Sequence, residues 1–431
     1  MTVQRYKIIE NRELRKRIIS YFCTQIMNRL RILWLLWLVS IGAMAQMDET
    51  DFCQEDSVEV ALPWPQNIQY RLDSLMQSKL LETSMVGMMV YDLTADSVLY
   101  QVNERQALRP ASTMKLLTSI TALDRLGGSY QFRTQLYYTG SVENHTLRGD
   151  LYCVGGFDPA FNNDDMRAFV ESIQRMGVDT IRGRLIADTS MKDANLLGEG
   201  WCWDDDNPKL SPLSVGRDID FLGRFMQELS DNGVVLDSIR LSEGYLPNDA
   251  YLLCSRFHSM DQILQRMMKM SDNFYAEAMF YQLAASTGRR PATAKDAAQV
   301  IKQLVRKVGN GKNPYRIADG CGLSLYNYVT PELEVRFLRY AYQNSNIYLH
   351  LLPSLPIAGC DGTLKTRMKG TFAEENVMAK TGTLTGIISL AGYCTAANGH
   401  KLCFSIINQG VMKNDPARNF QDKVCNALCA P

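Results

Sequence analysis

The stretch Pro110–Leu117 constrains this chain most strongly, because it places a serine and a lysine at the start of a predicted helix. Proline suits the first turn of a helix, where its missing N–H costs nothing. Apolar side chains then recur at helical spacing, at Leu116, Ile120 and Leu123. The pair Gly127-Gly128 ends the pattern. The i, i+3 spacing puts Ser112 and Lys115 on one helix face, within hydrogen-bonding reach of each other.

Ser112 and Lys115 together can form a nucleophile and its base. A serine hydroxyl is a poor nucleophile until a base takes its proton, and an unprotonated lysine can be that base. A free lysine titrates near ~10.4, so a pKa of about 7–8 requires about 4 kcal/mol of destabilisation of the charged form. Burial and the like charge of Lys380 would supply it. Chance alone gives about one or two Ser-x-x-Lys matches in such a chain, so an exposed serine and a solvated lysine are the competing interpretation.

Two further motifs follow along the chain and favour the catalytic interpretation. They are Ser271-Asp272-Asn273 and Lys380-Thr381-Gly382-Thr383. Ser-x-x-Lys, Ser-x-Asn and Lys-Thr-Gly, in this order, are the signature of penicillin-binding proteins and serine β-lactamases. Each triplet alone is a weak signal, but the ordered set indicates a serine enzyme.

The N-terminal region predicts export. A short basic stretch precedes the apolar run Ile32–Val39, and Ala43-Met44-Ala45 offers a small-x-small cleavage site. This pattern is typical of a secretory signal peptide over residues 1–45, with Met27 as an alternative start. The run is too short to span a bilayer, and acidic residues follow it at once. We therefore expect a flexible mature N-terminus at residues 46–61, a periplasmic location and no membrane span after cleavage.

The charge balance and the cysteines narrow the range of partners. Lys+Arg and Asp+Glu are equal at 46 each among 431 residues, and this balance argues against nucleic acid or an anionic membrane surface as the main partner. Eleven cysteines fit an oxidising compartment without proving disulfides. Neither a Cys-x-x-Cys pair nor a His-Glu-x-x-His motif occurs, so we predict no metal site and no cofactor.

The predicted secondary structure gives a mixed α+β fold. Five segments have strand-like patterns: 86–93, 97–101, 377–381, 387–395 and 401–407. Helical patterns occupy Leu72–Leu81 and Ala294–Val308, in addition to the helix that begins near Ser112. Two early strands and three late strands are too few for two sheets. We therefore expect one antiparallel five-stranded sheet flanked by helices, which the chain leaves and later rejoins.

The predicted secondary structure follows a different pattern in residues 129–255. Strand-like and helical stretches alternate there, at 132–138, 146–154, 164–175, 181–187, 218–230 and 234–241. We interpret residues 129–255 as an inserted smaller lobe. The main domain is then discontinuous and consists of residues 62–128 and 256–431.

The last two predicted strands should form a hairpin. Asn398-Gly399 is a strong signal for a two-residue turn, which makes Ala397 and His400 the closing pair. That register places Cys394 opposite Cys403, with Cα atoms about 4.5 Å apart, at the low end of the disulfide range. A disulfide and two buried free cysteines are the two alternatives.

Further segments extend the resemblance beyond the three motifs. They are Gly149–Pro159, Gly200–Asp205, Asp319–Ser324 and Leu355–Leu364. From about residue 65 to its end, the chain resembles the low-molecular-mass class C penicillin-binding proteins, the D-alanyl-D-alanine carboxypeptidase/endopeptidases of peptidase family S13. The resemblance implies a β-lactamase/transpeptidase-like fold. It also implies action on peptidoglycan stem peptides and cross-links, and inhibition by β-lactam antibiotics. The chain departs from the family pattern at Phe157, Cys321 and Gln409.

The resemblance implies roles for the motif residues in an acyl-enzyme route. Ser112 is the expected nucleophile and Lys115 its base. Ser271 is expected to relay a proton to the leaving amine, and Asn273 to hydrogen-bond Lys115 and the substrate amide. Lys380 is the expected anchor for the terminal carboxylate of the peptide, since a charge-assisted hydrogen bond to an anion is strong.

Five further residues complete the predicted pocket. Thr381 and Thr383 offer hydroxyls to the same carboxylate, and Gly382 leaves the strand edge open for the substrate backbone. The oxyanion hole is expected from the backbone N–H groups of the nucleophile and of Thr383. By resemblance, Asp188 and Arg367 line the pocket for the diamino acid of the stem peptide, with surface ion pairs as the equal alternative.

A serine β-lactamase and a non-catalytic peptidoglycan-binding module are the competing functions. A class A β-lactamase needs a Glu-x-x-x-Asn element after Ser-x-Asn to activate the deacylating water. Glu228 and Asn232 have that spacing but precede Ser271, at a predicted helix end. A non-catalytic module predicts damaged motifs, and all three motifs are intact. Carboxypeptidase and endopeptidase action both remain open, because both cut a bond after D-alanine.

Overall fold

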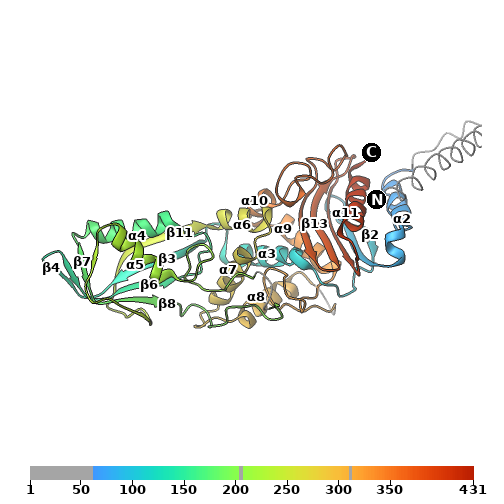
Figure 1. The fold of residues 1–431 in the computed structure, drawn as a ribbon. Coiled ribbons are helices and arrows are strands. Elements are labelled where there is room, and N and C mark those ends of the chain that lie inside the picture. The colour runs from blue at the N-terminus through green and yellow to red at the C-terminus, as the bar shows by residue number, and fades with distance from the viewer. Residues whose placement is uncertain (1–61, 203–206, 310–312) are drawn as a thin grey trace, which may run out of the picture. The chain divides into compact units, whose positions relative to one another are not determined.

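A five-stranded antiparallel sheet forms the centre of the region that carries the three motifs (Figure 1). The computed structural model describes residues 62–202, 207–309 and 313–431, so the predicted signal peptide and the predicted flexible stretch at 46–61 lie outside it. The strand order is β12-β13-β14-β1-β2. The strands are β1 (Met85–Asp92), β2 (Ser97–Val102), β12 (Met378–Leu384), β13 (Ile387–Thr395) and β14 (Lys401–Gln409). The predicted sheet of two early and three late strands is confirmed.

Helices cover both faces of this sheet, so the middle strands are buried. β13 and β14 are buried along almost their whole length, as expected for strands with a core on either side. One face carries two helices, α2 (Gln66–Leu75) and α11 (Asn414–Cys429). The other core is built from the sheet and a layer of six helices: α3 (Met114–Leu126), α6 (Met260–Lys269), α7 (Asn273–Ala285), α8 (Ala294–Lys307), α9 (Pro331–Gln343) and α10 (Ser345–Ser354).

The helix α2 differs from its prediction. It begins six residues before the predicted helix Leu72–Leu81, and a 3-10 turn follows at Lys79–Glu82. The extended backbone of Ser78 (φ −62°, ψ 136°) separates the two. The buried stripe consists of Ile68 and Leu72 at i, i+4 spacing, so the apolar face lies one turn earlier than predicted.

The β13–β14 hairpin closes through a three-residue loop rather than the predicted two-residue turn. The Ala396 N–H donates to the His400 carbonyl at 2.9 Å, and the Gly399 N–H donates to the Ala396 carbonyl at 2.9 Å. Gly399 has a φ of +87°, a left-handed conformation that glycine adopts without steric cost and that ends such loops. The predicted closing pair of Ala397 and His400 is therefore wrong by one residue.

This register separates the two cysteines of the predicted disulfide. Cys394 pairs with Leu402, and Cys403 pairs with Tyr393. A slip of one residue moves a side chain to the opposite face of a sheet. Accordingly, Cys394 and Cys403 lie in the two separate apolar cores on either side of the sheet. Both are buried free thiols, so the predicted Cys394–Cys403 disulfide is wrong and the alternative of buried free cysteines is confirmed.

Residues 131–259, called the lobe below, form two further sheets with a core of their own. The larger sheet has the order β10-β8-β6-β3-β11 and the smaller one β4-β5-β7-β9. The elements are β3 (Gln131–Tyr138), β4 (Ser141–Glu143), β5 (Thr146–Arg148), β6 (Leu151–Gly155), α4 (Asn163–Arg175), β7 (Thr180–Arg182), β8 (Arg184–Asp188), α5 (Phe221–Asp231), β9 (Val235–Leu236), β10 (Arg240–Glu243) and β11 (Tyr251–Ser259). The Met260 N–H donates to the Tyr130 carbonyl at 2.9 Å, so the chain returns beside the point where it left.

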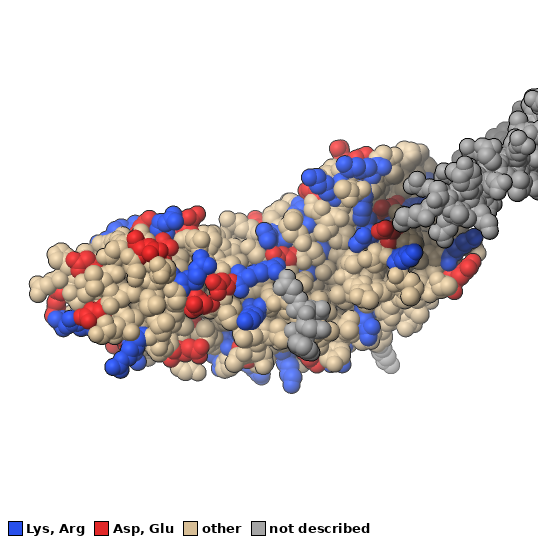
Figure 2. Space-filling view, viewed as in Figure 1, with Lys and Arg blue, Asp and Glu red and all other residues tan. Residues whose placement is uncertain are grey.

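Both signs of charge occur on the face of the described residues that Figure 2 shows. Lys and Arg side chains are interspersed with Asp and Glu over the face shown in Figure 2. The chain as a whole contains equal numbers of acidic residues and of lysine plus arginine. Within the described ranges, no helix combines the length and the apolar character that a membrane crossing requires.

Candidate active site

Ser112 and Lys115 lie where the chain turns into α3. A 3-10 turn over Ala111–Thr113 precedes the helix, which begins at Met114. Ser112 is partly exposed, whereas the side chain of Lys115 is completely buried. Lys115 Nζ lies 2.9 Å from Ser112 Oγ, so the predicted hydrogen-bonded pair is present.

Two carbonyl-type oxygens complete the surroundings of the Lys115 amine. Nζ lies 2.8 Å from Asn273 Oδ1 and 2.8 Å from the backbone carbonyl of Cys321. A neutral amine has two N–H groups and one lone pair. The two oxygens can accept both N–H groups, which leaves the lone pair directed at the Ser112 hydroxyl. Burial lowers the pKa of Lys115, while neighbouring acidic groups act in the opposite direction: Cys321, Asp319, Glu277 and Asp272.

Ser271 and Asn273 are held by the short connection between α6 and α7. Ser271 has a φ of +58°, a left-handed conformation that non-glycine residues rarely adopt and that often marks functional sites. Asp272 caps α7 by accepting the Phe274 N–H at 3.1 Å. Arg217 and Arg266 both pair with the Asp272 carboxylate, at 3.3 and 3.2 Å. This anchored cap fixes the residues on either side of it.

Lys380 brings the third motif into contact with the second. Its Nζ donates to Ser271 Oγ at 2.8 Å and to the Thr381 carbonyl at 2.7 Å. The side chain is fully buried. Burial, together with the positive charge of Lys115, places the pKa of Lys380 well below its usual value. The repulsion expected between the two lysines therefore acts on Lys380, whereas at Lys115 burial is the lowering cause.

Gly382 lets β12 approach the turn that carries Ser112. A Cβ at this position would lie 2.1 Å from Ser389 Oγ and 2.9 Å from both the Pro110 carbonyl and the Ser112 nitrogen. Ser389 Oγ itself donates to the Pro110 carbonyl at 2.5 Å. The absence of a side chain at Gly382 thus serves the packing of β12 on this turn, rather than only the open strand edge that the sequence suggests.

The two threonines of the third motif lie next to Gly382 on β12. Thr383 is exposed and pairs with Ile388 in the sheet. Thr381 Oγ1 donates to Oγ1 of Thr363 at 2.7 Å. Thr363 belongs to a 3-10 turn within the segment Leu355–Leu364, which the family resemblance singled out without assigning a role to any residue.

The loop Asp319–Ser324 supplies the Cys321 carbonyl, a contact that no motif in the sequence predicts. Glu277 Oε1 accepts the N–H groups of Gly320 and Cys321, each at 2.8 Å. Asp319 accepts four N–H donors, from Gly322, Ser324, Trp201 and Asn327. One sequence signal was available, because Glu277 follows Asn273 by four residues and so shares its helix face.

Glu277, Asp319 and Cys321 also form a group of potential metal ligands, with donor atoms within 4.8 Å of one another. Their carboxylate oxygens already accept backbone and side-chain N–H groups. A cation there would have to displace these donors. The donor set is therefore suited to holding the loop rather than a metal ion.

Asp188 and Arg367, the remaining predicted site residues, lie in structural contacts. Asp188, at the end of β8, accepts the N–H groups of Ser190 and Leu246 at 3.0 and 2.8 Å. Arg367 pairs with Asp422 of α11 at 2.6 Å, and its side chain is only 12% exposed. The structure thus does not bring these two residues into contact with the three motifs, and their substrate role remains a prediction.

The lobe contains the Glu-x-x-x-Asn element and a separate cavity. Asn232 ends α5 and hydrogen-bonds Glu228 within the same helix, as its predicted position at a helix end requires.

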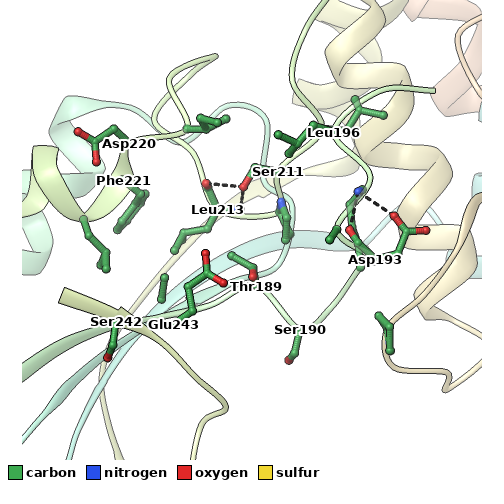
Figure 3. Close-up of a pocket in the computed structure, with 18 of the residues that line it drawn as sticks. Thr189, Ser190, Asp193, Leu196, Ser211, Leu213, Asp220, Phe221, Ser242 and Glu243 are labelled. Carbon is green, nitrogen blue, oxygen red and sulfur yellow. Dashed lines mark hydrogen bonds and ion pairs between the residues drawn. The ribbon is translucent and has the colours of Figure 1, made fainter. Parts of the chain in front are cut away.

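A cavity of about 710 Å³ lies beside the end of β8. Carboxylates line it, from Asp193, Asp220 and Glu243 (Figure 3). Its lining includes no residue of the three motifs.

Comparison with known sequences identifies the family. The sequence profile of the D-Ala-D-Ala carboxypeptidase 3 (S13) family matches residues 68–214 and 208–429. D-alanyl-D-alanine carboxypeptidase DacB of Haemophilus influenzae is 27% identical over 444 residues, which cover 83% of this chain and 92% of that protein. A D-alanyl-D-alanine carboxypeptidase of an Actinomadura species is 27% identical over 439 residues, covering 79% of this chain and 80% of its own length.

Solved structures share the fold. The crystal structure of penicillin-binding protein 4 from Haemophilus influenzae superposes with a TM-score of 0.72 at 24% identity, covering 82% of this chain and 97% of that one. A second structure of that protein holds a β-lactam and matches with a TM-score of 0.70 at 26% identity, covering 82% and 98% of the two chains. The predicted α+β fold class is thereby confirmed. Because the profile matches nearly the whole length from residue 68 to residue 429, this chain belongs to the D-Ala-D-Ala carboxypeptidase 3 (S13) family.

Proposed function

We propose that this protein is a serine D-alanyl-D-alanine carboxypeptidase/endopeptidase that acts on peptidoglycan stem peptides and cross-links through an acyl-enzyme on Ser112. The observation that carries the proposal is the position of Lys115 Nζ, within 2.9 Å of Ser112 Oγ and 2.8 Å of Asn273 Oδ1. These residues come from two of the three motifs. The third motif joins them through Lys380 and Ser271.

In the proposed acylation step, Lys115 takes the proton of the Ser112 hydroxyl while Oγ bonds to the carbonyl carbon of the penultimate D-alanine. The carbonyl oxygen gains a negative charge, which the backbone N–H groups of Ser112 and Thr383 stabilise. Removing one such donor typically costs about 3–4 kcal/mol. The proton then passes from Lys115 through Ser271 to the leaving nitrogen as the C–N bond breaks. Water subsequently hydrolyses the ester and restores the Ser112 hydroxyl.

Substrate recognition is assigned to the third motif. Lys380 binds the terminal carboxylate, with the hydroxyls of Thr381 and Thr383 beside it. An anion next to a lysine favours the ammonium form, so substrate binding opposes the lowering of the Lys380 pKa by burial. β-Lactam antibiotics carry a comparable carboxylate and an acylating carbonyl, so they acylate Ser112 by the same steps.

The proposed location and domain organisation follow from the sequence. A signal peptide over residues 1–45 directs the protein to the periplasm, where peptidoglycan is available. Residues 62–128 and 256–431 form the penicillin-binding domain, and residues 129–255 the inserted lobe. The return of the chain at Met260 beside Tyr130 supports an insertion, and β11 carries the lobe four residues past the proposed boundary, to Ser259.

Digestion of purified muropeptides tests this function. The protein is expected to release D-alanine from pentapeptides, to split cross-linked dimers, or to do both, whereas Ser112→Ala releases neither product. Rapid hydrolysis of penicillin without any action on muropeptides would instead support the β-lactamase alternative. Retention of muropeptides without cleavage or acylation would support the non-catalytic module.

A further inference from the structure

The Lys115 amine can act as a base only while its lone pair is directed at Ser112. The direction depends on the two oxygens that accept its N–H groups, those of Asn273 and Cys321. The Asn273 oxygen belongs to a side chain at the start of α7. The Cys321 oxygen belongs to the backbone of a loop, so something must hold that loop against Lys115.

Glu277 is in a position to hold it. The side chain lies on α7, one turn after Asn273, and the residue is only 1% exposed. Its Oε1 accepts the N–H groups of Gly320 and Cys321, each at 2.8 Å. The carbonyl that contacts Lys115 belongs to Cys321, the second of these two residues. One face of α7 therefore presents one acceptor to Lys115 directly and fixes the second acceptor through the loop.

We propose that Glu277 is a positioning residue for Lys115: by binding the Gly320 and Cys321 N–H groups, it keeps the Cys321 carbonyl on the lysine amine. This role rests on the proposed acyl-enzyme function, in which Lys115 is the base. It concerns a residue outside the three motifs, and Glu277 itself touches neither Ser112 nor the reacting atoms in the proposed mechanism.

The rest of the loop is braced independently. Asp319 accepts the Gly322 N–H at 2.8 Å and the Ser324 N–H at 2.6 Å, and Cys321 Sγ donates to it at 3.6 Å. Gly322 has a φ of +85°, and a Cβ there would lie 1.8 Å from the Ala111 carbonyl. The C-terminal half of the loop is thus fixed by Asp319 and by close packing, whereas its N-terminal half is fixed by Glu277.

The charge of Glu277 also bears on Lys115. Burial, and next the charge of Asp319, raise the pKa of Glu277 to about 8. Other titratable groups interact with it from the elements packed around it: Lys115 on α3, Lys192 after β8, Cys321 in the loop and Tyr281 on α7. Below about pH 8 Glu277 is uncharged. Above that pH it becomes an anion that favours the ammonium form of Lys115.

The pH dependence of acylation by a fluorescent penicillin separates positioning from mere structural support. Three variants are compared with the wild type: Glu277→Met, Glu277→Gln and the control Glu332→Ala. Methionine fills a similar volume but accepts no hydrogen bond, whereas glutamine keeps an oxygen for the two N–H groups. Glu332 is also buried, lies on α9 and pairs with Arg336 at 2.6 Å, so its loss perturbs a buried carboxylate outside this network.

We expect Glu277→Met to lower the acylation rate constant at pH 7 at least 30-fold. The acid limb of its pH profile of acylation should also move to higher pH. The reason is that the Lys115 amine loses an acceptor, becomes more accessible to water and so regains a higher pKa. Glu277→Gln should stay within about threefold of the wild type at pH 7 and exceed it above pH 8, where only the wild type acquires the opposing anion. The control should lower thermal stability without moving either limb of the profile.

Two results would overturn the role. One is a Glu277→Met protein with the wild-type pH profile. The other is a Glu277→Gln protein that loses as much activity as Glu277→Met at pH 7. If Glu277→Met does not fold, the glutamine comparison above and below pH 8 still decides the matter. Absence of any acylation in the wild type would overturn the proposed function itself, and the Glu277 role with it.

Discussion

Lys115 and Lys380 are both fully buried, which is rare for lysine because removing an ammonium group from water is costly. Each has a set of oxygen partners instead: Ser112, Asn273 and Cys321 for Lys115, and Ser271 and Thr381 for Lys380. Burial shifts both pKa values toward the neutral amine. A base needs the neutral amine, so the shift suits the proposed role of Lys115. A carboxylate anchor needs the ammonium form, so the shift at Lys380 has to be reversed when the substrate binds.

The anchor role predicts that Lys380→Ala discriminates between substrates. Hydrolysis of a D-Ala-D-Ala peptide should fall about 10- to 100-fold more than hydrolysis of an ester substrate without the terminal carboxylate, because a hydrogen bond to a charged group contributes ~1.5–3 kcal/mol. Steady-state kinetics on both substrates measure the difference. Equal losses on the two would show that Lys380 acts by setting the pKa of Lys115 rather than by binding the carboxylate.

Glu334 on α9 predicts a pH dependence of stability. Burial raises its pKa to about 7, and its Oε2 accepts from Ser405 Oγ at 2.6 Å. Since the unfolded chain releases this proton near pH 4.5, the stabilisation is complete below that pH and is lost as the pH rises toward 7. Glu334 should therefore lower the free energy of unfolding by up to ~3 kcal/mol between pH 5 and pH 8.

The variant Glu334→Gln should have a flatter stability profile over that range, as measured by urea unfolding at pH 5 and pH 8. The matched control is Glu332→Gln on the same helix. Burial opposes the ionisation of Glu332, but its bonds to Arg336 lower its pKa, so it stays ionised throughout this range. An unchanged slope in Glu334→Gln would mean that Glu334 is already ionised in the folded protein at pH 5.

At the level of secondary-structure elements, the site depends on the packing of β12 against the turn that carries Ser112. Gly382 makes it possible, and Gly382→Ala should lower the acylation rate constant at least ~100-fold, because the new methyl group meets the Ser112 nitrogen and the Pro110 carbonyl at 2.9 Å. Gly244→Ala in the lobe is the control, since its methyl group meets only Ile186, at 3.2 Å. Acylation of Gly382→Ala at the wild-type rate would show that β12 can shift without disturbing Ser112.

The β13–β14 register predicts the state of two cysteines. Cys394 and Cys403 face opposite cores, so neither can reach the other. Peptide mapping of the purified protein without reductant should therefore find no peptide that joins them. Recovery of a Cys394–Cys403 cross-linked peptide would require a hairpin that is one residue out of the register described here.

Across the whole molecule, the parts that the sequence predicts well are those with a local or repeated signal. The helix after Pro110 carries an apolar repeat, and β13 and β14 are mostly apolar, so the sequence predicts both. The pairing of Ser112 with Lys115 follows from i, i+3 spacing alone. The convergence of Asn273 on the same amine could be expected only from the family resemblance, because the two residues are 158 positions apart.

Other features depend on tertiary packing and have no comparable signal. The Cys321 carbonyl is a backbone group, so no side-chain pattern marks its role beside Lys115. The hairpin register does not follow from Asn398-Gly399 alone, because this pair fits both a two-residue and a three-residue connection. The sequence predicts an open strand edge at Gly382 but not its close contact with the turn before α3, because that turn is remote in sequence.

The proposed mechanism depends on Ser112 as the nucleophile of an acyl-transfer enzyme. Intact-mass measurement after incubation with penicillin tests this assignment. The wild-type protein is expected to gain the mass of one penicillin and to lose it slowly, whereas Ser112→Ala gains none. A Ser112→Ala protein that still acquires the adduct would contradict the assignment of the nucleophile, and with it the account of Lys115 as its base.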